Sequence, residues 1–398
     1  MEQQRLRISD AEFKERAAKA QRLMAEEGYD AILCYGNEAE PQFVRYFSDY
    51  WPSFETAGVL IPREGEAKLL IGPESFTYAY DRSRLRDIRL LKAFRESSEP
   101  EYPGKKLDTF TSVLDECLPG VKIKKIGVAG LPLMTVGVYF ALQEALAAYG
   151  EVKLEKADHV IAKLRMCKSE AELACMRRAA DITHKTMDFV IENVATGMTE
   201  TQVVGLALGK MHELGAERES YQLWVLTGAG SDQAISRPRQ KVIEKGDMTF
   251  FQFGARYEGY ASAIGRPVVF GKANDEQRRL IETGYALQEK ILAITKAGVP
   301  AKEIAEYHLK LVKEYGYEDH YLYGPFHGNG LMEGEAPWVE LNSDYLLAEN
   351  MTFCSDLFLG SHETKRGIRI EDVVRVTKDG CENLTAYPRT LFEIEKSL

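Results

Sequence analysis

The sequence predicts two domains, an α/β domain over residues 1–160 and an α+β domain over residues 161–398 in which helices back a curved antiparallel sheet. Three observations lead to this fold class. A chain of 398 residues exceeds what one hydrophobic core usually serves. Helical and strand patterns alternate in the first part of the chain. In the second part they come in blocks of helices, strands, helices and strands, which is typical of an α+β domain.

The α/β domain opens with a helix over residues 10–27, where apolar residues recur with helical spacing. Gly28 then leads into a strand over residues 31–35. Further strands are expected at residues 58–61, 67–71 and 125–128, and further helices at residues 111–117 and 135–149. This alternation indicates a three-layer domain with a sheet between helices.

The α+β domain begins with a capped helix, after a boundary that falls between residues 153 and 168. Ser169 stands as the N-cap, Glu172 completes a capping box, and the helix ends near Gly197. The elements expected after it are a helix at 199–214, strands at 223–226, 248–253 and 256–262, helices at 276–297 and 301–314, and a strand-rich stretch at 351–376.

Charge and cysteine usage exclude several classes of function. The net charge is -10, and lysine and arginine are dispersed among acids, so we expect no nucleic-acid partner. The apolar stretches are too short to cross a bilayer, so we expect no membrane partner. The six cysteines form no CxxC pair, which indicates reduced thiols in a cytoplasmic protein.

Several motifs of the second domain follow one another in a fixed order. They are KSEAEL at residues 168–173, KGD at 245–247, FFQFGARYEGY at 250–260, Arg266, HGNGL at 327–331, EAP at 335–337 and GIRIED at 367–372. Together they resemble the creatinase/aminopeptidase P family, whose members are called pita-bread enzymes. The resemblance covers the whole chain. It implies an N-terminal α/β domain, a C-terminal pita-bread domain and a homodimer.

Family metallopeptidases hold two divalent cations with two aspartates, one histidine and two glutamates. The resemblance places these positions at Gln252, Ala263, His327, Asp356 and Glu371, and a second family histidine at Gly334. Two carboxylates are therefore missing, and alanine offers no ligand atom, so a bridged pair of cations lacks the negative charge that would hold it. We expect no metal cofactor. The alternative is a single manganese, zinc or cobalt ion held by His327, Asp356 and Glu371.

The resemblance then favours family members that work without metal. The first hypothesis is a creatinase-like hydrolase that cleaves an amide, amidine or ureido C–N bond of a small polar or zwitterionic substrate. His327 would move the proton, and Asp356 and Glu371 would polarise or bind the cationic part. A salt bridge of these carboxylates with Arg266 or Arg369 is the structural alternative. Two other hypotheses stay open: an Xaa-Pro dipeptidase or aminopeptidase with a single metal, and a catalytically inactive binding protein.

Other polar side chains are candidates for binding this small-molecule substrate. Gln252 and Asn329 offer neutral donors and acceptors that suit an amide or a urea-like group. Arg239 and Arg266, together with Arg237, are candidates to clamp a substrate carboxylate with paired hydrogen bonds.

Two further groups of residues are expected near the opening of the pocket. Glu335 and Glu333 stand in a glycine-containing loop and are candidates for the pocket mouth. Tyr50, Trp51 and Phe54 concentrate aromatic side chains in an apparent loop of the first domain, which indicates binding. The resemblance implies that this loop reaches over the pocket of the partner in a homodimer.

Overall fold

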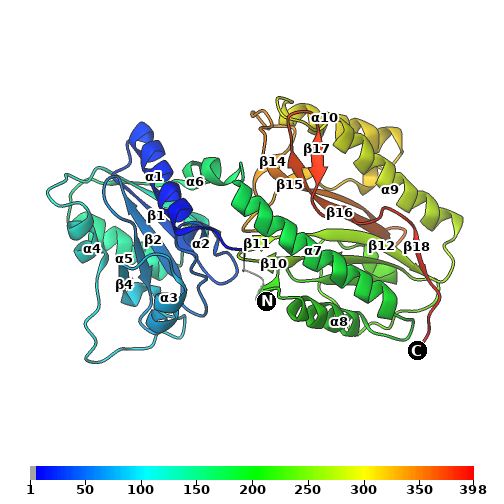
Figure 1. Cartoon of the computed structure of the whole chain (residues 1–398), viewed down its shortest axis with the longest axis horizontal. Coiled ribbons are helices and arrows are strands. Elements are labelled where there is room, and N and C mark those ends of the chain that lie inside the picture. The colour runs from blue at the N-terminus through cyan, green and yellow to red at the C-terminus, as the bar shows by residue number, and fades with distance from the viewer. Residues whose placement is uncertain (1–5) are drawn as a thin grey trace. The chain divides into compact units, whose positions relative to one another are not determined.

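The computed structural model describes residues 6–398, which form two units (Figure 1). The N-terminal unit comprises Ile8–Arg165, and the C-terminal unit comprises Met166–Leu398 together with Leu6 and Arg7. The first unit is an α/β domain and the second is an α+β domain with a mainly antiparallel sheet, so the predicted fold class is confirmed.

A mixed sheet forms the centre of the N-terminal unit, with the strand order β4-β3-β2-β1-β5-β6. Its strands are β1 (Ala31–Gly36), β2 (Ala57–Pro62), β3 (Lys68–Ile71), β4 (Ile88–Leu90), β5 (Lys125–Ala129) and β6 (Lys153–Lys156). β1 pairs in parallel with β5 and antiparallel with β2, and all of its residues are buried. A strand buried in this way needs a covering layer on both faces of the sheet.

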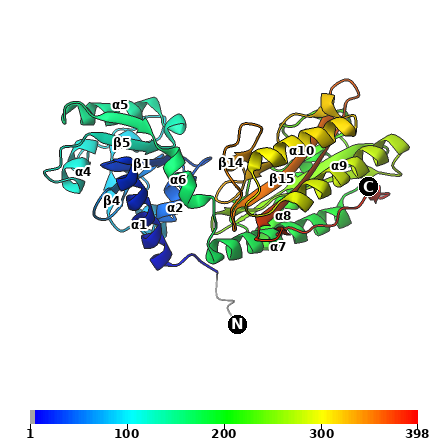
Figure 2. The same cartoon turned by 90° about the horizontal axis from the view of Figure 1, so that it is seen from above.

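Helices supply both layers. They are α1 (Asp10–Glu27), α2 (Gln42–Ser48), α3 (Phe76–Arg82), α4 (Phe110–Cys117), α5 (Val136–Ala147) and α6 (Asp158–Arg165). Phe110 and Leu114 of α4 and Leu142 of α5 share an apolar core with Leu33 of β1. Figure 2 shows α1 and α6 on the other side of the sheet from α5. The result is the three-layer arrangement that the alternation of elements predicted.

A second sheet organises the C-terminal unit, in the order β14-β13-β15-β16-β12-β9-β8. Its strands are β8 (Trp224–Thr227), β9 (Met248–Phe253), β12 (Ile264–Phe270), β13 (Phe326–Gly328), β14 (Glu335–Val339), β15 (Thr352–Ser361) and β16 (Arg366–Val376). At its margins β17 (Cys381–Asn383) pairs with β16, and β18 (Phe392–Ile394) runs parallel to β12. A small sheet has the order β11-β10-β7, with β7 (Arg218–Glu219), β10 (Ala255–Tyr257) and β11 (Tyr260–Ala261).

Helices pack on one face of the large sheet. They are α7 (Glu170–Asn193), α8 (Glu200–Glu213), α9 (Asp275–Ile294) and α10 (Ala301–Glu314). α7 begins with the predicted capping box: the Ser169 side chain accepts from the backbone N–H of Glu172, and the Glu172 side chain accepts from that of Ser169.

Alternate residues of the strands make the contact with these helices. Phe251 and Phe253 of β9 pack in one apolar cluster with α7 and α8, and Leu357 and Leu359 of β15 pack in another with α9 and α10. Successive side chains of a strand point to opposite faces of the sheet. The residues between these apolar ones therefore project from the face opposite the helices, where polar groups gather.

The hairpin at residues 255–261 is a difference from the single strand expected over residues 256–262. Glu258 and Gly259 join β10 to β11 and have φ angles of 47° and 87°. Glycine adopts positive φ without a steric penalty, so this position can reverse the chain. The strand β12 was not predicted. The short elements α2, α3, α6, β4, β6, β7, β13, β14, β17 and β18 were not predicted either, because they are too short to show a period.

Candidate functional site

Chemically active side chains form a row across the strands of the C-terminal sheet. In register, Gln252 (β9) lies opposite Gly265 (β12), Gly265 opposite Glu371 (β16), Glu371 opposite Asp356 (β15), and Cys354 (β15) opposite His327 (β13). Directly opposed residues project to the same face of a sheet. Cys354 and Asp356 are two residues apart on one strand, so they also share that face. The row therefore collects acids, an amide, a thiol and an imidazole.

His327 lies at the centre of this buried cluster. Its Nε2 atom is 3.5 Å from a carboxylate oxygen of Glu333 and 3.9 Å from oxygens of both Asp356 and Glu371. The other ring nitrogen, Nδ1, lies 3.2 Å from the carbonyl oxygen of Gly328. A carbonyl oxygen only accepts, so Nδ1–H donates to it. Nε2 is the ring nitrogen that faces the acidic side chains.

Four of these residues meet the geometric requirement for holding a metal ion. The potential ligand atoms of His327, Glu333, Cys354 and Glu371 all lie within 4.8 Å of one another. His327 and Glu371 were expected as ligands of a single ion. Asp356 was expected as the third ligand, but Glu333 and Cys354 are the residues that complete this group.

Glu371 is fully buried among other acids. The Gln252 side-chain amide donates to its Oε2 atom. Burial raises the pKa of Glu371 well above its usual range, and the negative charges of Glu333 and Asp356 raise it further, against the opposing charge of Arg369. A carboxyl in this environment favours its neutral form unless a positive charge joins it.

Several buried polar atoms around Glu371 have no hydrogen-bond partner. They are Oε1 of Glu371, the side-chain oxygens of Gln252 and Asn329, and the hydroxyl of Tyr221. An unpartnered buried polar group is costly, so native structures usually satisfy it with water, an ion or a ligand. Carboxylate and amide oxygens are acceptors, and they suit a cation or an ammonium group.

Asp356 differs from its expected role as a catalytic or metal-binding acid. Arg369 binds both of its carboxylate oxygens, and the Tyr323 hydroxyl donates to Oδ2 at 2.7 Å. The Nη1 atom of Arg369 donates to the carbonyl of Ala234 at 2.8 Å, and the guanidinium lies 4.7 Å from the centre of the Trp224 ring. Asp356 is therefore the salt-bridged acid of the structural alternative.

The positions of the missing family ligands do not suit a second cation. Ala263 is fully buried and has no donor atom. A Cβ atom at Gly265 would lie 2.3 Å from the Gln252 side-chain oxygen, so the glycine makes room for this amide. A Cβ at Gly334 would lie 3.9 Å from Nδ1 of His327, so the place of the second histidine is open. The site fits one cation and does not fit two.

Arg266 lies on the helix-covered face of the sheet, away from the row. Its Nη2 atom pairs with Asp372 at 2.6 Å, and its other donors bind backbone carbonyls, including that of Glu371 at 2.9 Å. All of its donors are thus used inside the protein. Arg266 supports the backbone of β16, and the expectation that it clamps a substrate is not met.

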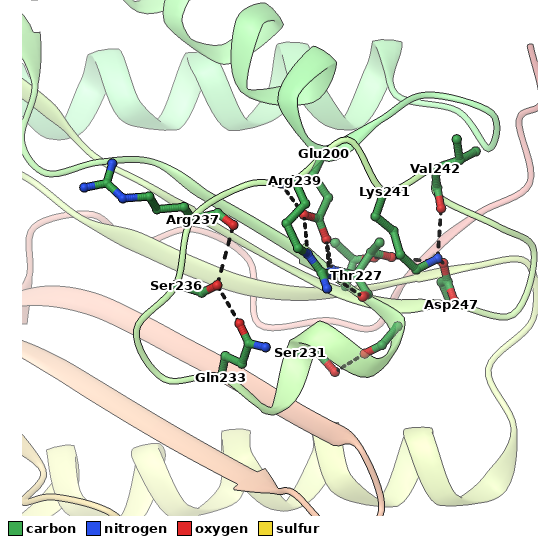
Figure 3. A network of polar contacts seen from close by, with 12 residues as sticks. Glu200, Thr227, Ser231, Gln233, Ser236, Arg237, Arg239, Lys241, Val242 and Asp247 are labelled. Atoms are coloured by element: carbon green, nitrogen blue, oxygen red, sulfur yellow. Dashed lines mark hydrogen bonds and ion pairs between the residues drawn. The ribbon is translucent and has the colours of Figure 1, made fainter.

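Arg239 is held by a buried acid. It donates to Glu200 from its backbone nitrogen at 2.6 Å, from Nε at 3.0 Å and from Nη2 at 2.6 Å (Figure 3). Glu200 is fully buried at the start of α8 and also accepts from the backbone nitrogen of Thr227 at 2.8 Å. This latch, made of Arg239 and Glu200, ties down the segment after the 3-10 turn η3 (Gly228–Asp232). The structure gives Arg239 an anchoring role in place of substrate binding, whereas Arg237 is exposed.

Asn329 directly follows β13, and Glu335 is the first residue of β14. Asn329 donates to the carbonyl of Glu333 at 3.2 Å and keeps its candidate place beside the cluster. Glu335 forms a buried ion pair with Lys168 at 3.4 Å and accepts from the backbone of Met332. Glu335 is therefore fixed at the start of β14, which contrasts with its expected place at a pocket mouth.

Trp51 and Phe54 belong to the N-terminal unit. The Trp51 indole donates to the carbonyl of Glu38 at 2.8 Å, and the Arg45 guanidinium lies 5.0 Å from the centre of its ring. Phe54 is 85% exposed. Their contact with a partner's pocket, and the homodimer itself, stay predictions.

Several residues of the site have neighbours that the sequence alone did not predict. Cys354 was expected to be one of six reduced thiols without a role in the site, yet it precedes Asp356 by two residues in a long strand, and the strand period places both on one face. The same spacing relates Arg369 to Glu371. Tyr323 and Trp224 carried no such signal, because their neighbours in the site come from distant parts of the chain.

The fold and this cluster define a pita-bread protein with the donor groups of a metal-dependent or acid–base hydrolase. Residues 174–378 match the model of metallopeptidase family M24, and residues 16–167 match that of the creatinase/prolidase N-terminal domain. The chain belongs to metallopeptidase family M24. The resemblance drawn from the ordered motifs is thereby confirmed.

Similar proteins cover nearly the whole chain. An Xaa-Pro dipeptidase of Pyrococcus furiosus is 28% identical over 95% of this chain and 100% of its own length. The solved structure of an X-Pro aminopeptidase from Thermotoga maritima has a TM-score of 0.81 and 28% identity, and covers 95% of this chain and 99% of its own. The prolidase structure from Pyrococcus horikoshii has a TM-score of 0.79 and 26% identity, over 95% and 99%.

Within residues 6–398, none of the helices combines the length and apolar character needed to span a membrane. The cytoplasmic location stays a prediction.

Proposed function

We propose that this chain hydrolyses a C–N bond of a small peptide, in the manner of an Xaa-Pro dipeptidase, and that it uses one divalent cation where its family uses two. The similarity to Xaa-Pro dipeptidases over nearly the whole chain supports this alternative better than the creatinase-like hypothesis. The observation that carries the proposal is the convergence of His327, Glu333, Cys354 and Glu371 within 4.8 Å on this fold. It also replaces the expectation that no metal is used.

A divalent cation in this position supplies a Lewis acid that polarises the scissile carbonyl. The protein's own residues bind and orient the peptide. The unpartnered oxygens of Gln252 and Asn329 accept from the N–H groups of the substrate. The acids of the cluster favour a substrate with a free ammonium group, since Arg369 is already neutralised by Asp356.

An apolar wall stands beside the polar row. Leu226, Phe250 and Phe358 form a buried cluster on the same face, and Trp224 and Tyr323 pack against it. Side chains of this kind bury a compact apolar group such as a proline ring, at roughly 25 cal/mol per Å² removed from water. This supports a dipeptide with one apolar residue as the substrate class.

A second candidate is the metal-independent, creatinase-like hydrolase that acts on an amide, amidine or ureido bond. The observation that favours it is the pair of Glu371 and His327, whose facing atoms are 3.9 Å apart. Glu371 has a pKa raised by burial and would serve as a proton donor, with His327 as the base. No cation is needed for this chemistry.

Hydrolysis of Ala-Pro and Leu-Pro by the full chain tests the proposal. We expect activity that a chelator removes and that one equivalent of zinc or cobalt restores. His327→Ala should abolish it, whereas His212→Ala, at an exposed histidine of α8, should not. Cleavage that persists in the chelator would support the second candidate. Dipeptides that bind and are returned intact would contradict the dipeptidase proposal and would favour a binding protein.

A further inference from the structure

Cys354 is the residue of the cluster whose chemistry differs most from that of its neighbours. It lies opposite His327 across β13 and β15, and its side chain is fully buried. The thiol lies 3.7 Å from the carbonyl oxygen of Glu333 and within hydrogen-bonding reach of the Glu371 carboxyl. A buried cysteine in an apolar core needs no explanation, but this one faces an imidazole and two carboxylates.

We infer that Cys354 is a thiolate ligand of the cation, and that the site is mononuclear with Cys354, His327, Glu371 and Glu333 as its donors. This inference deepens the proposed function by naming the ligand set and the class of ion. It departs from the oxygen-and-histidine set of the family, and from the single-ion set with Asp356 that the sequence suggested.

The charges around the cluster call for a cation. Arg369 is bound to Asp356 on both carboxylate oxygens, so its positive charge is neutralised by that acid. Glu371 and Glu333 are left with the imidazole of His327 at 3.9 and 3.5 Å as their nearest basic group. A metal ion would neutralise these acids and the thiol together.

Two details of geometry also point to an ion. Oε1 of Glu371 is buried and accepts no hydrogen bond, whereas Oε2 is occupied by the amide of Gln252. The hydrogen bond from Nδ1 of His327 to the carbonyl of Gly328 leaves Nε2 as the coordinating atom. Metal-binding histidines are typically oriented by such a bond at the second ring nitrogen.

A thiolate, an imidazole and carboxylates together favour zinc or cobalt. Sulfur is a soft donor that zinc accepts readily, whereas magnesium, calcium and manganese prefer oxygen. Cys354 therefore decides the class of ion, because imidazole and carboxylate ligands occur in sites for many different metals. Glu333 is the most exposed of the four side chains, so it is the donor that an incoming substrate would displace.

Cobalt spectroscopy on the untagged, metal-stripped chain tests the ligand set. We expect one cobalt ion per chain and a near-ultraviolet thiolate-to-cobalt charge-transfer band. Cys354→Ser should remove the band and weaken cobalt binding by roughly tenfold or more. Cys167→Ser, at an exposed cysteine outside the cluster, should leave both unchanged.

Glu371→Gln gives a second variant of nearly the same shape. It should weaken cobalt binding and keep the charge-transfer band. This variant keeps the ligand set testable if Cys354→Ser fails to fold. A band that survives in folded Cys354→Ser, or a chain that binds no cobalt, would overturn the inference. Cobalt bound with the band but without peptide cleavage would contradict the proposed function alone.

Discussion

Arg369 binds both carboxylate oxygens of Asp356, from Nε at 3.0 Å and from Nη2 at 2.5 Å. The two side chains project from neighbouring strands, β15 and β16, beside the cluster. Both are buried, and the Tyr323 hydroxyl adds a third hydrogen bond to the acid. The pair fixes the local charge of the site and sets the mutual position of the two strands that carry Cys354 and Glu371.

Arg369→Met is expected to destabilise the protein by about 3–5 kcal/mol, because it leaves Asp356 buried without its partner. Urea denaturation measures the free energy of unfolding. The double variant Asp356→Asn with Arg369→Met should recover much of the loss. Arg366→Met, on the same strand but partly exposed, should cost about 1 kcal/mol or less. Equal losses for Arg366→Met and Arg369→Met would contradict this account.

Gln252→Asp is expected to make stability depend on metal. Without a cation the new acid repels Glu371 and loses the amide donor, which should cost about 1–3 kcal/mol. With zinc present the added charge should strengthen binding, so the rise in Tm on adding zinc should exceed that of the parent. Gln288→Asp is the matched control, since Gln288 is buried but donates to the carbonyl of Ser355 outside the cluster. It should lose stability without recovering it on adding zinc.

Glu200→Gln is expected to loosen the segment that Arg239 anchors. The variant keeps the shape of the side chain but removes the charge that binds the guanidinium, so about 1–3 kcal/mol of stabilisation should be lost. Limited trypsin digestion should cut after Arg239 several times faster than in the parent. Arg237→Gln removes an exposed arginine of the same segment and should leave cleavage after Arg239 unchanged. An unaltered rate in Glu200→Gln would show that the latch does not order the segment.

His308 should make the protein less stable in mild acid. Burial lowers its pKa from 6.5 to about 4 in the folded chain. Between these values the unfolded chain binds a proton that the folded chain does not, so the free energy of unfolding falls as the pH drops, by up to about 1.4 kcal/mol per unit. His308→Phe should flatten this slope between pH 6.5 and 4. His212→Gln, at an exposed histidine, should keep it, and identical slopes for parent and His308→Phe would refute the assignment.

Much of the scaffold could be predicted because local signals agree with the final fold. The capping box of Ser169 and Glu172 marks the start of α7, and ordered motifs place His327 and Glu371 in one family site. The errors come from contacts that no local pattern records. Arg266 is one residue away from Gly265 in the sequence, and that step moves it to the other face of the sheet. Asp356 was placed correctly on its strand, but its partner Arg369 decides what it does.

Gly265 has a consequence for how closely its neighbouring strands can approach. A Cβ atom there would lie 2.3 Å from the Gln252 side-chain oxygen and 2.9 Å from the backbone nitrogen of Glu371. The amide is the end of a flexible side chain and could turn aside, whereas the backbone of β16 could not. The missing side chain at 265 therefore lets β16 lie close enough for Glu371 to meet the amide of Gln252.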